Sequence, residues 1–282
     1  MPAAVLFDWG DTLIRFAYDE ALVEAGHRAG LAALRRSDLP EVERVAEHFR
    51  DRYEPLFWAP GTVEELEYPG LVRQLLGDFG VDVDDDELTR FLEAEHAAWD
   101  PARQLAAHTP ALLEALRARG LKLGLVSNAF DPGWLLHRDL EQMGLAERLD
   151  FAVFSSEVGT RKPHPAIFER ALDALGVAAA DTVFVGDRLY EDVRGSAELG
   201  MTTVQALWFR ADEHPEGGEP DFQAFTQMDV LNVVGRLDAA SVRCGLAGRP
   251  PGVLALDRVL VKSCGAGIRS PKIPIWRRSA TS

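Results

Sequence analysis

The chain has 282 residues, of which 47% are hydrophobic, and a formal net charge of −15. This length is sufficient for one large apolar core and a smaller one, so we expect one large domain that carries an insertion or a lesser domain. The negative charge argues against a protein that binds nucleic acid or an anionic membrane surface, since both require basic patches. No apolar run reaches membrane-spanning length and no signal peptide is visible, so we expect a cytoplasmic protein.

The first predicted element is a strand over residues 4–9, a continuous apolar run typical of a strand buried on both faces. Residues 15–104 show helical periodicity instead, with turn signals at Pro60-Gly61 and Pro69-Gly70. This stretch predicts an all-helical insertion above the end of the first strand, where insertions commonly act as lids. Its helices are expected at residues 19–36, 40–53, 63–79 and 84–99.

After the insertion, strands and helices alternate along the chain. This alternation implies right-handed crossovers and an open parallel sheet with helices on both faces. We therefore predict an α/β fold, a three-layer Rossmann-like parallel sheet with an inserted all-helical cap domain. Residues 1–14 and 105–240 would form the core domain, and residues 15–104 the cap. The later strands are expected at residues 121–127, 151–155, 182–186 and 202–208, with helices at residues 133–143, 165–175 and 191–199.

The segment from residue 241 to residue 282 differs from the rest in charge and composition. It holds eight Lys or Arg residues against the single acid Asp257, and it is rich in Gly, Pro and Ser. Its periodicity is weak, which favours a disordered or loosely docked basic tail. The composition is compatible both with docking on the acidic body and with a tail that has no structural role.

Polar side chains follow the predicted strands directly. Asp8 ends the first strand, Ser127 and Asn128 end the second, and Asp187 follows the fourth. Ligands of open parallel sheets bind beyond the carboxyl ends of the strands, so these residues should meet at one edge. Lys162 precedes a predicted helix and supplies positive charge suited to a phosphate. Carboxylates beside a lysine and a hydroxyl suit Mg²⁺ together with a phosphate group.

These segments, in this order and at these strand ends, resemble the haloacid dehalogenase superfamily of phosphohydrolases. The helical insertion is similar to the cap of its helical-cap (C1) subfamily. The similarity covers roughly residues 3 to 238, and the set of segments is far more specific than any one of them. The resemblance implies a Mg²⁺-dependent hydrolase that acts on a small phosphorylated metabolite.

The resemblance also assigns roles to residues of this chain. Asp8 matches the nucleophile that becomes an aspartyl-phosphate, and Lys162 matches the lysine that steadies nucleophile and phosphate. Ser127 matches the hydroxyl that binds a phosphate oxygen, and Asn128 either contacts substrate or braces the turn. The implied metal-binding residues are Asp8, Gly10 through its backbone carbonyl, Asp187, and Asp192, an acid that orients the metal's waters and pairs with the lysine.

The first segment departs from the usual D-x-D-G-T pattern. The second Asp, which protonates the leaving group, is replaced by Gly10, and an acid follows at Asp11. Such acid–base assistance is typically worth about 10²–10⁴-fold in rate. Asp11 is therefore a candidate catalytic residue, or the substrate has a good leaving group, as an acyl phosphate does, or the protein mainly binds its ligand. A dehalogenase-like hydrolase, which needs no such acid, remains an alternative. A lysine-dependent phosphonate hydrolase is disfavoured, because residues 15–104 contain no lysine.

Overall fold

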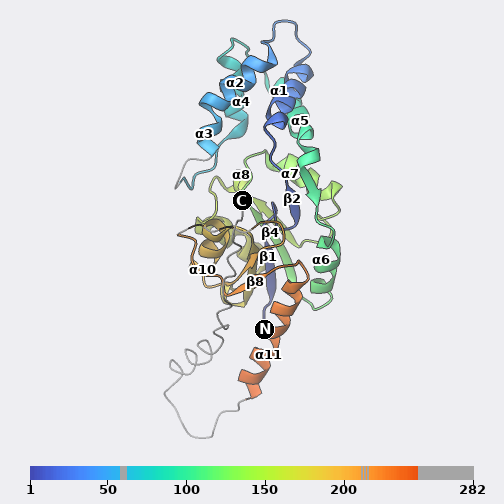
Figure 1. Cartoon of the computed structure of the whole chain (residues 1–282), viewed down its shortest axis with the longest axis vertical. Coiled ribbons are helices and arrows are strands. Elements are labelled where there is room, and N and C mark those ends of the chain that lie inside the picture. The colour runs from blue at the N-terminus through green and yellow to red at the C-terminus, as the bar shows by residue number, and fades with distance from the viewer. Residues whose placement is uncertain (58–61, 211, 213, 215, 247–282) are drawn as a thin grey trace, which may run out of the picture.

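The computed structural model describes residues 1–57, 62–210, 212, 214 and 216–246 (Figure 1). Six parallel strands form the central sheet in the order β5-β4-β1-β6-β7-β8. The predicted α/β fold is confirmed. The bounds of the five predicted strands differ from the observed ones by up to two residues, and the sixth strand, β8, was not predicted. The strands are β1 (Ala4–Phe7), β4 (Lys122–Ser127), β5 (Phe151–Phe154), β6 (Thr182–Gly186), β7 (Thr202–Ala206) and β8 (Phe222–Ala224).

The sheet register places β1 at the centre, between β4 and β6. Phe7 lies opposite Leu125 of β4 and Val185 of β6. Because the strands are parallel, the residues that follow Phe7, Val126 and Gly186 all emerge at one edge of the sheet. The sheet register therefore sets the location of the candidate site.

Helices cover both faces of the sheet, and each face has its own apolar cluster. One cluster joins the sheet to α6 (Thr109–Arg117), α7 (Gly133–Gln142) and α11 (Asp229–Leu246). The other joins it to α9 (Pro165–Leu175) and includes Met201, next to α10 (Gly195–Glu198). All four residues of β1 are fully buried, as expected for a strand covered on both faces. The molecule is thus a three-layer sandwich around the sheet.

The inserted segment forms a helical cap beyond one end of the sheet, at the top of Figure 1. Its helices share a separate apolar cluster, in which Phe91 and Leu75 are fully buried. Local sequence signals set the helix ends: Asp84 and Glu87 form a capping box at the start of the last long helix. The helices are α1 (Glu20–Leu34), α2 (Val42–Arg52), α3 (Glu54–Phe57), α4 (Tyr68–Gly77) and α5 (Asp85–Ala98).

The structure differs from the sequence-based expectation in several elements. The insertion is not wholly helical at its ends, because β2 (Ile14–Phe16) and β3 (Arg103–Leu105) pair antiparallel where the chain enters and leaves the cap. Because each of these strands has only three residues, the alternation of apolar and polar residues is too short to identify them from the sequence. The predicted helix over residues 191–199 is a π-helical segment, η3 (Leu189–Arg194), followed by α10. Residues 241–246 continue α11, and the rest of the predicted tail lies outside the described residues.

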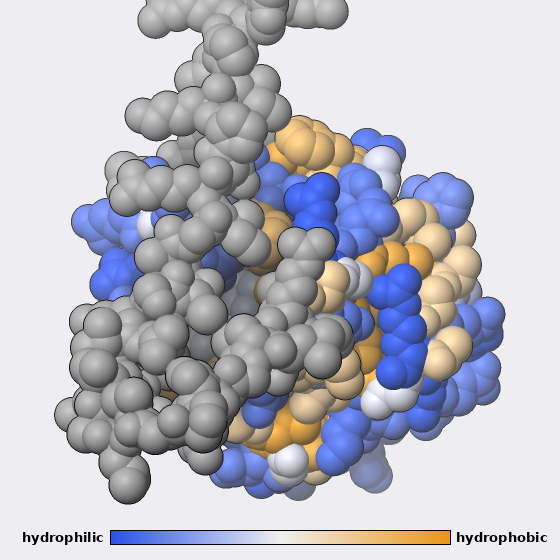
Figure 2. All heavy atoms as spheres, turned by 90° about the horizontal axis from the view of Figure 1, so that it is seen from below, coloured by the Kyte–Doolittle hydropathy of each residue, from blue (hydrophilic) through white to orange (hydrophobic). Residues whose placement is uncertain are grey.

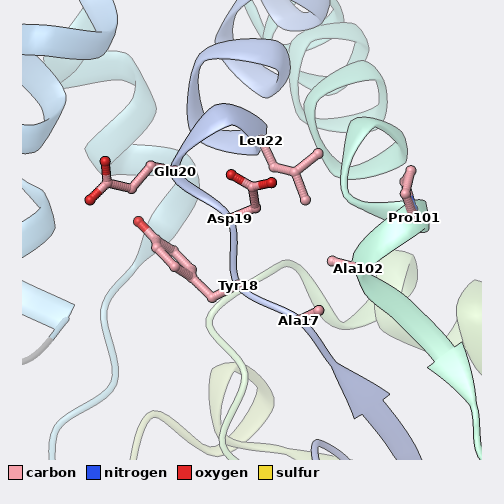
Figure 3. A pocket seen from close by; sticks show the side chains of 7 residues that line it. All are labelled: Ala17, Tyr18, Asp19, Glu20, Leu22, Pro101 and Ala102. Carbon is pink, nitrogen blue, oxygen red and sulfur yellow. The ribbon is translucent and has the colours of Figure 1, made fainter. Parts of the chain in front are cut away.

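A cavity of about 580 Å³ lies where the chain passes between sheet and cap (Figure 3). Tyr18 and Asp19 line it from the chain leading into α1, Glu20 from the start of α1, and Pro101 and Ala102 from the returning chain. None of the residues that line this cavity is a site residue predicted from the sequence. The cavity therefore lies at the junction of cap and core.

Seen from below, from the end opposite the cap, hydrophilic and hydrophobic residues are interspersed across the visible part of the described surface (Figure 2). Within the described ranges, no helix combines the length and apolar character that a membrane crossing requires.

Candidate active site

Three predicted site residues lie at the carboxyl edge of the sheet, on its central strands. Asp8 follows β1 directly, Ser127 is the last residue of β4, and Asp187 follows β6 directly. All three are buried, with exposed fractions of 7%, 4% and 1%. The sheet therefore brings together residues that are 179 positions apart in the chain (187 − 8 = 179).

Lys162 connects the acids at this edge. Its Nζ donates hydrogen bonds to Asp8 Oδ1 at 2.6 Å, to Asp192 Oδ1 at 2.6 Å and to the carbonyl oxygen of Val126 at 3.0 Å. These three bonds use all the donors of an ammonium group. Burial alone would lower the pKa of Lys162, but the charges of Asp192 and Asp8 outweigh it and raise the pKa above its ordinary value. The lysine is therefore held as a buried cation.

The loop that carries Lys162 is fixed by its neighbours. Both ends of the Asn128 amide bind the lysine backbone: Oδ1 accepts from Lys162 N at 2.7 Å, and Nδ2 donates to Lys162 O at 3.2 Å. His164 Nδ1 accepts from Ala166 N at 3.2 Å and caps α9. Asn128, predicted either to contact substrate or to brace the turn, braces the lysine loop in this structure.

Asp192 packs against Gly186 at the end of β6 and has no exposed surface. Its Oδ2 accepts from the backbone N of Arg188 at 3.0 Å while its Oδ1 binds Lys162. Gly186 makes this position possible, because a Cβ at residue 186 would come within 2.6 Å of Asp192 Cβ. Burial raises the pKa of Asp192 to about 6, although Lys162 opposes the shift. The strand end thus requires glycine so that a carboxylate can fit under it.

Asp187 is buried and accepts no hydrogen bond from any described group. A cation nevertheless lies beside it, since Arg210 Nε is 3.2 Å from its Oδ2. Burial, followed by the charges of Asp192 and Asp8, raises the pKa of Asp187 to about 8. A buried carboxylate with unused acceptor oxygens is energetically costly unless a cation or a ligand binds there.

The residues present fit a divalent cation. Single carboxylate oxygens of Asp8, Asp187 and Asp192 lie within 4.8 Å of one another. Hard oxygen ligands of this kind suit Mg²⁺, and the unused oxygens of Asp187 supply free ligand atoms. Asp192 is already bonded to Lys162 and to Arg188 N, so Asp8 and Asp187 are the better placed for direct contact with an ion.

Gly10 and Asp11 occupy the turn after β1. Asp11 has a φ of 53°, in the left-handed region that glycine favours and Asp tolerates better than most residues. Its Oδ1 accepts from Phe16 N at 3.2 Å, and its Oδ2 lies 3.9 Å from Arg210 Nη1. The described hydrogen bonds and ion pairs of Asp11 therefore lead to β2 and to Arg210 rather than to Asp8 or Lys162.

The cap contacts the core beside Lys162. Backbone hydrogen bonds join Arg161 N to Val63 O at 2.7 Å and Glu65 N to Gly159 O at 3.0 Å. Glu65 also accepts a hydrogen bond from Ser155 Oγ, and Arg161 Nε lies 3.6 Å from Glu65 Oε2. The segment between α3 and α4 is thus attached to the loop that carries the lysine.

Sequence reasoning did not find Arg210, Glu65 or Ser155. Arg210 was detectable in principle, since it comes four residues after the end of β7, at the edge where sheet ligands bind. Glu65 and Ser155 carry no local signal, because their pairing depends on how the cap meets the core.

Comparison with known proteins identifies the family. The sequence profile of haloacid dehalogenase-like hydrolases matches residues 2–200. The chain is 29% identical over 241 residues to the glyceraldehyde 3-phosphate phosphatase of Methanopyrus kandleri, spanning 84% of this chain and 99% of that protein. It is 32% identical over 203 residues to haloacid dehalogenase-like hydrolase domain-containing protein 3 of Danio rerio, spanning 70% of this chain and 81% of that protein.

A solved structure gives the same result. The 2-haloacid dehalogenase of Pseudomonas syringae pv. Tomato is 26% identical, with a TM-score of 0.62 over 84% of this chain and all of that chain. The buried acids and the lysine at the edge of the sheet therefore lie in a fold shared with known hydrolases. The chain belongs to the haloacid dehalogenase-like hydrolase family.

Proposed function

We propose that the protein is a Mg²⁺-dependent hydrolase of a small phosphorylated metabolite, with Asp8 as the nucleophile. The observation that carries the proposal is the buried lysine that bonds Asp8 and Asp192, next to the unbonded oxygens of Asp187. A phosphoryl group approaching Asp8 would meet a positive charge that is already in place. The likeness to a glyceraldehyde 3-phosphate phosphatase over nearly the whole of that relative supports a small phosphorylated compound as substrate.

Each residue has a role that its position supports. Asp8 would attack phosphorus through a carboxylate oxygen, giving an aspartyl-phosphate and releasing the alcohol or acid of the substrate. Lys162 would hold the Asp8 carboxylate in place, and the Ser127 hydroxyl would bind a phosphate oxygen. Asp8, Asp187 and the Gly10 carbonyl would hold Mg²⁺, with Asp192 orienting its waters. When bound, Mg²⁺ supplies charge neutralisation for the phosphate and its developing negative charge.

Protonation of the leaving group is the unusual step. Gly10 has no side chain to donate a proton, and the contacts of Asp11 lead away from Asp8. The site therefore favours a substrate whose leaving group is already acidic, such as an acyl phosphate, over a simple alkyl phosphate. The net charge of −15 is compatible with a small substrate that a local cation cluster binds, and it disfavours nucleic acid as a partner.

The test is phosphate release from a panel of metabolites, with excess Mg²⁺ or with EDTA. We expect release that needs Mg²⁺ and falls to background in the Asp8→Asn variant. A matched control is Asp38→Asn, a change at a carboxylate paired with Arg36 on the exposed α1–α2 loop. Release that survives both EDTA and Asp8→Asn would refute the proposal.

A second candidate, a dehalogenase-like hydrolase, is favoured by Gly10 and by the likeness to a 2-haloacid dehalogenase. A departing halide needs no proton, so the missing acid would cost nothing. The cluster of Asp8, Asp187 and Asp192 argues against it, because three carboxylates gathered within 4.8 Å suit a divalent cation that the dehalogenase reaction does not need. Halide release from 2-haloacids in EDTA supports the dehalogenase, and its absence removes it.

A further inference from the structure

Asp187 has a cationic neighbour that the proposed reaction does not use. Arg210 Nε lies 3.2 Å from Asp187 Oδ2, and Arg210 Nη1 lies 3.9 Å from Asp11 Oδ2. The guanidinium is therefore close to two acids at the edge where the ion would bind. Arg188, the other arginine near Asp187, pairs with Glu191 at 3.4 Å.

The loop that carries Arg210 is attached on both sides of it. Trp208 Nε1 donates to Thr12 O at 3.0 Å, and Leu189 N donates to Asp212 Oδ2 at 2.8 Å. The Arg210 side chain is 38% exposed, whereas the Asp187 side chain is 1% exposed. The two hydrogen bonds thus hold the loop of Arg210 at the site, while the guanidinium has a path to solvent.

An arginine and a divalent ion compete for the same carboxylate. Mg²⁺ needs a carboxylate oxygen of Asp187 as a ligand, and it repels a guanidinium at this separation. Without an ion, Arg210 offsets part of the charge gathered by Asp8, Asp187 and Asp192, which Lys162 alone does not balance. The same contact must weaken when an ion binds.

We propose that Arg210 is a built-in counterion of the metal site. It stabilises the Asp187 carboxylate in the metal-free protein and is displaced when Mg²⁺ binds. Arg210 is then a positioning residue that sets metal affinity, and it takes no part in the chemical step. This inference rests on the proposed function, because it requires that Asp187 bind an ion.

The test is Mg²⁺ binding by isothermal titration calorimetry, without substrate, in wild type, Arg210→Ala and Arg210→Gln. Measurement at about pH 9 limits the competition of protons for Asp187. We expect the Kd for Mg²⁺ to fall roughly 3- to 10-fold in both variants, since a competing and repelling cation is removed. The matched control is Arg194→Ala, which removes a 39%-exposed arginine from its ion pair with Glu198 at 2.8 Å and should leave the Kd unchanged.

A thermal measurement gives an independent readout. In EDTA, Arg210→Ala should melt at a lower temperature than wild type, and excess Mg²⁺ should remove that difference. An unchanged or weaker Mg²⁺ affinity in both Arg210 variants would overturn the counterion role and leave the proposed function standing. Failure of wild type to bind Mg²⁺ would overturn the metal site itself, and with it the proposed function.

Discussion

At the residue scale, the segment that starts at Asp8 differs from the D-x-D-G-T pattern, because the second Asp and the Gly have exchanged places. Gly10 stands where an acid is expected, and Asp11 stands where glycine is expected, with a φ of 53°. The exchange explains why Asp11 has the left-handed backbone conformation that glycine favours, and its carboxylate accepts a hydrogen bond from Phe16 N. The fold tolerates the exchange, whereas we expect it to impair protonation of the leaving group.

Restoring the D-x-D-G-T order at residues 10 and 11 should restore the acid that protonates the leaving group. A Cβ at residue 10 would find only Phe16 Cβ, at 3.9 Å, so Gly10→Asp has space. We expect Gly10→Asp with Asp11→Gly to raise kcat/KM for alkyl phosphates by about 10²-fold and to change acyl phosphate hydrolysis little. Steady-state assays of both substrate types check this. A fall for alkyl phosphates would show that Asp11, or another group, already supplies the proton.

Gly186 should be intolerant of any side chain. Gly186→Ala would force Asp192 away from Lys162, because the new Cβ overlaps the Asp192 side chain. We expect a loss of roughly 2–4 kcal/mol in the free energy of unfolding, since a buried lysine loses a partner. Urea denaturation measures this loss. Gly10→Ala is the matched control, and equal stability of the two variants would contradict the account.

At the element scale, a buried charge cluster joins cap helix α5 to core helix α7. His96 on α5 lies 2.9 Å from Asp139 on α7 and 2.9 Å from Asp131 just before it. Arg103 Nε lies 3.2 Å from Asp139 and completes the cluster. Burial lowers the pKa of His96, but hydrogen bonds to Asp131 and Asp139 outweigh it and raise the pKa above its ordinary value.

The stability that this cluster contributes should depend on pH. A raised folded-state pKa means that the contribution is complete below about pH 6.5, the unfolded value, and is lost as pH rises through the folded value. We expect His96→Gln to cost roughly 3 kcal/mol at about pH 6 and clearly less at about pH 9. Denaturant melts at both pH values measure the difference. His137→Gln, at a 43%-exposed histidine paired with Glu157, is the control, and a cost independent of pH would contradict the assignment.

The elements that sequence predicted well are those with strong local signals. The apolar runs of β1, β4 and β6 and the capped helix α9 need no knowledge of the rest of the chain. The short β2, β3 and β8 depend on partners distant in sequence, and the π-helical turn at Leu189–Arg194 depends on fitting Asp192 under Gly186. Asp8 and Asp187 could be predicted from strand ends and Lys162 from its place just before helix α9, whereas the approach of Arg210 to Asp187 is a tertiary contact.

At the scale of the whole molecule, metal binding should be visible as stability. Three acids share one edge of the sheet with the buried Lys162 and with Arg210, so without an ion the negative charge of the site is balanced only in part. A ligand at about 100 times its Kd adds about 2.7 kcal/mol to the free energy of unfolding. We expect excess Mg²⁺ to raise Tm by roughly 5–10 °C over EDTA.

Scanning calorimetry with and without Mg²⁺ measures this shift. Asp187→Asn should lose most of it, because the variant removes the charge of the acid with unused oxygens. Asp221→Asn is the control, because Asp221 is an exposed carboxylate away from the site that accepts hydrogen bonds only from Thr203 among the described groups. If Mg²⁺ raised the Tm of Asp187→Asn as much as that of wild type, the ion would bind at another position and the account would be contradicted.

Asp8 should carry the phosphoryl group during turnover, and trapping the aspartyl-phosphate tests this most directly. Wild-type enzyme quenched during turnover and reduced with borohydride should contain homoserine at position 8, because hydride converts an acyl phosphate to an alcohol and releases phosphate. Peptide mass spectrometry locates the modified residue. Modification at position 8 that needs both substrate and Mg²⁺ is the result we predict. Turnover with an unmodified Asp8, or with the label on another residue, would contradict the account.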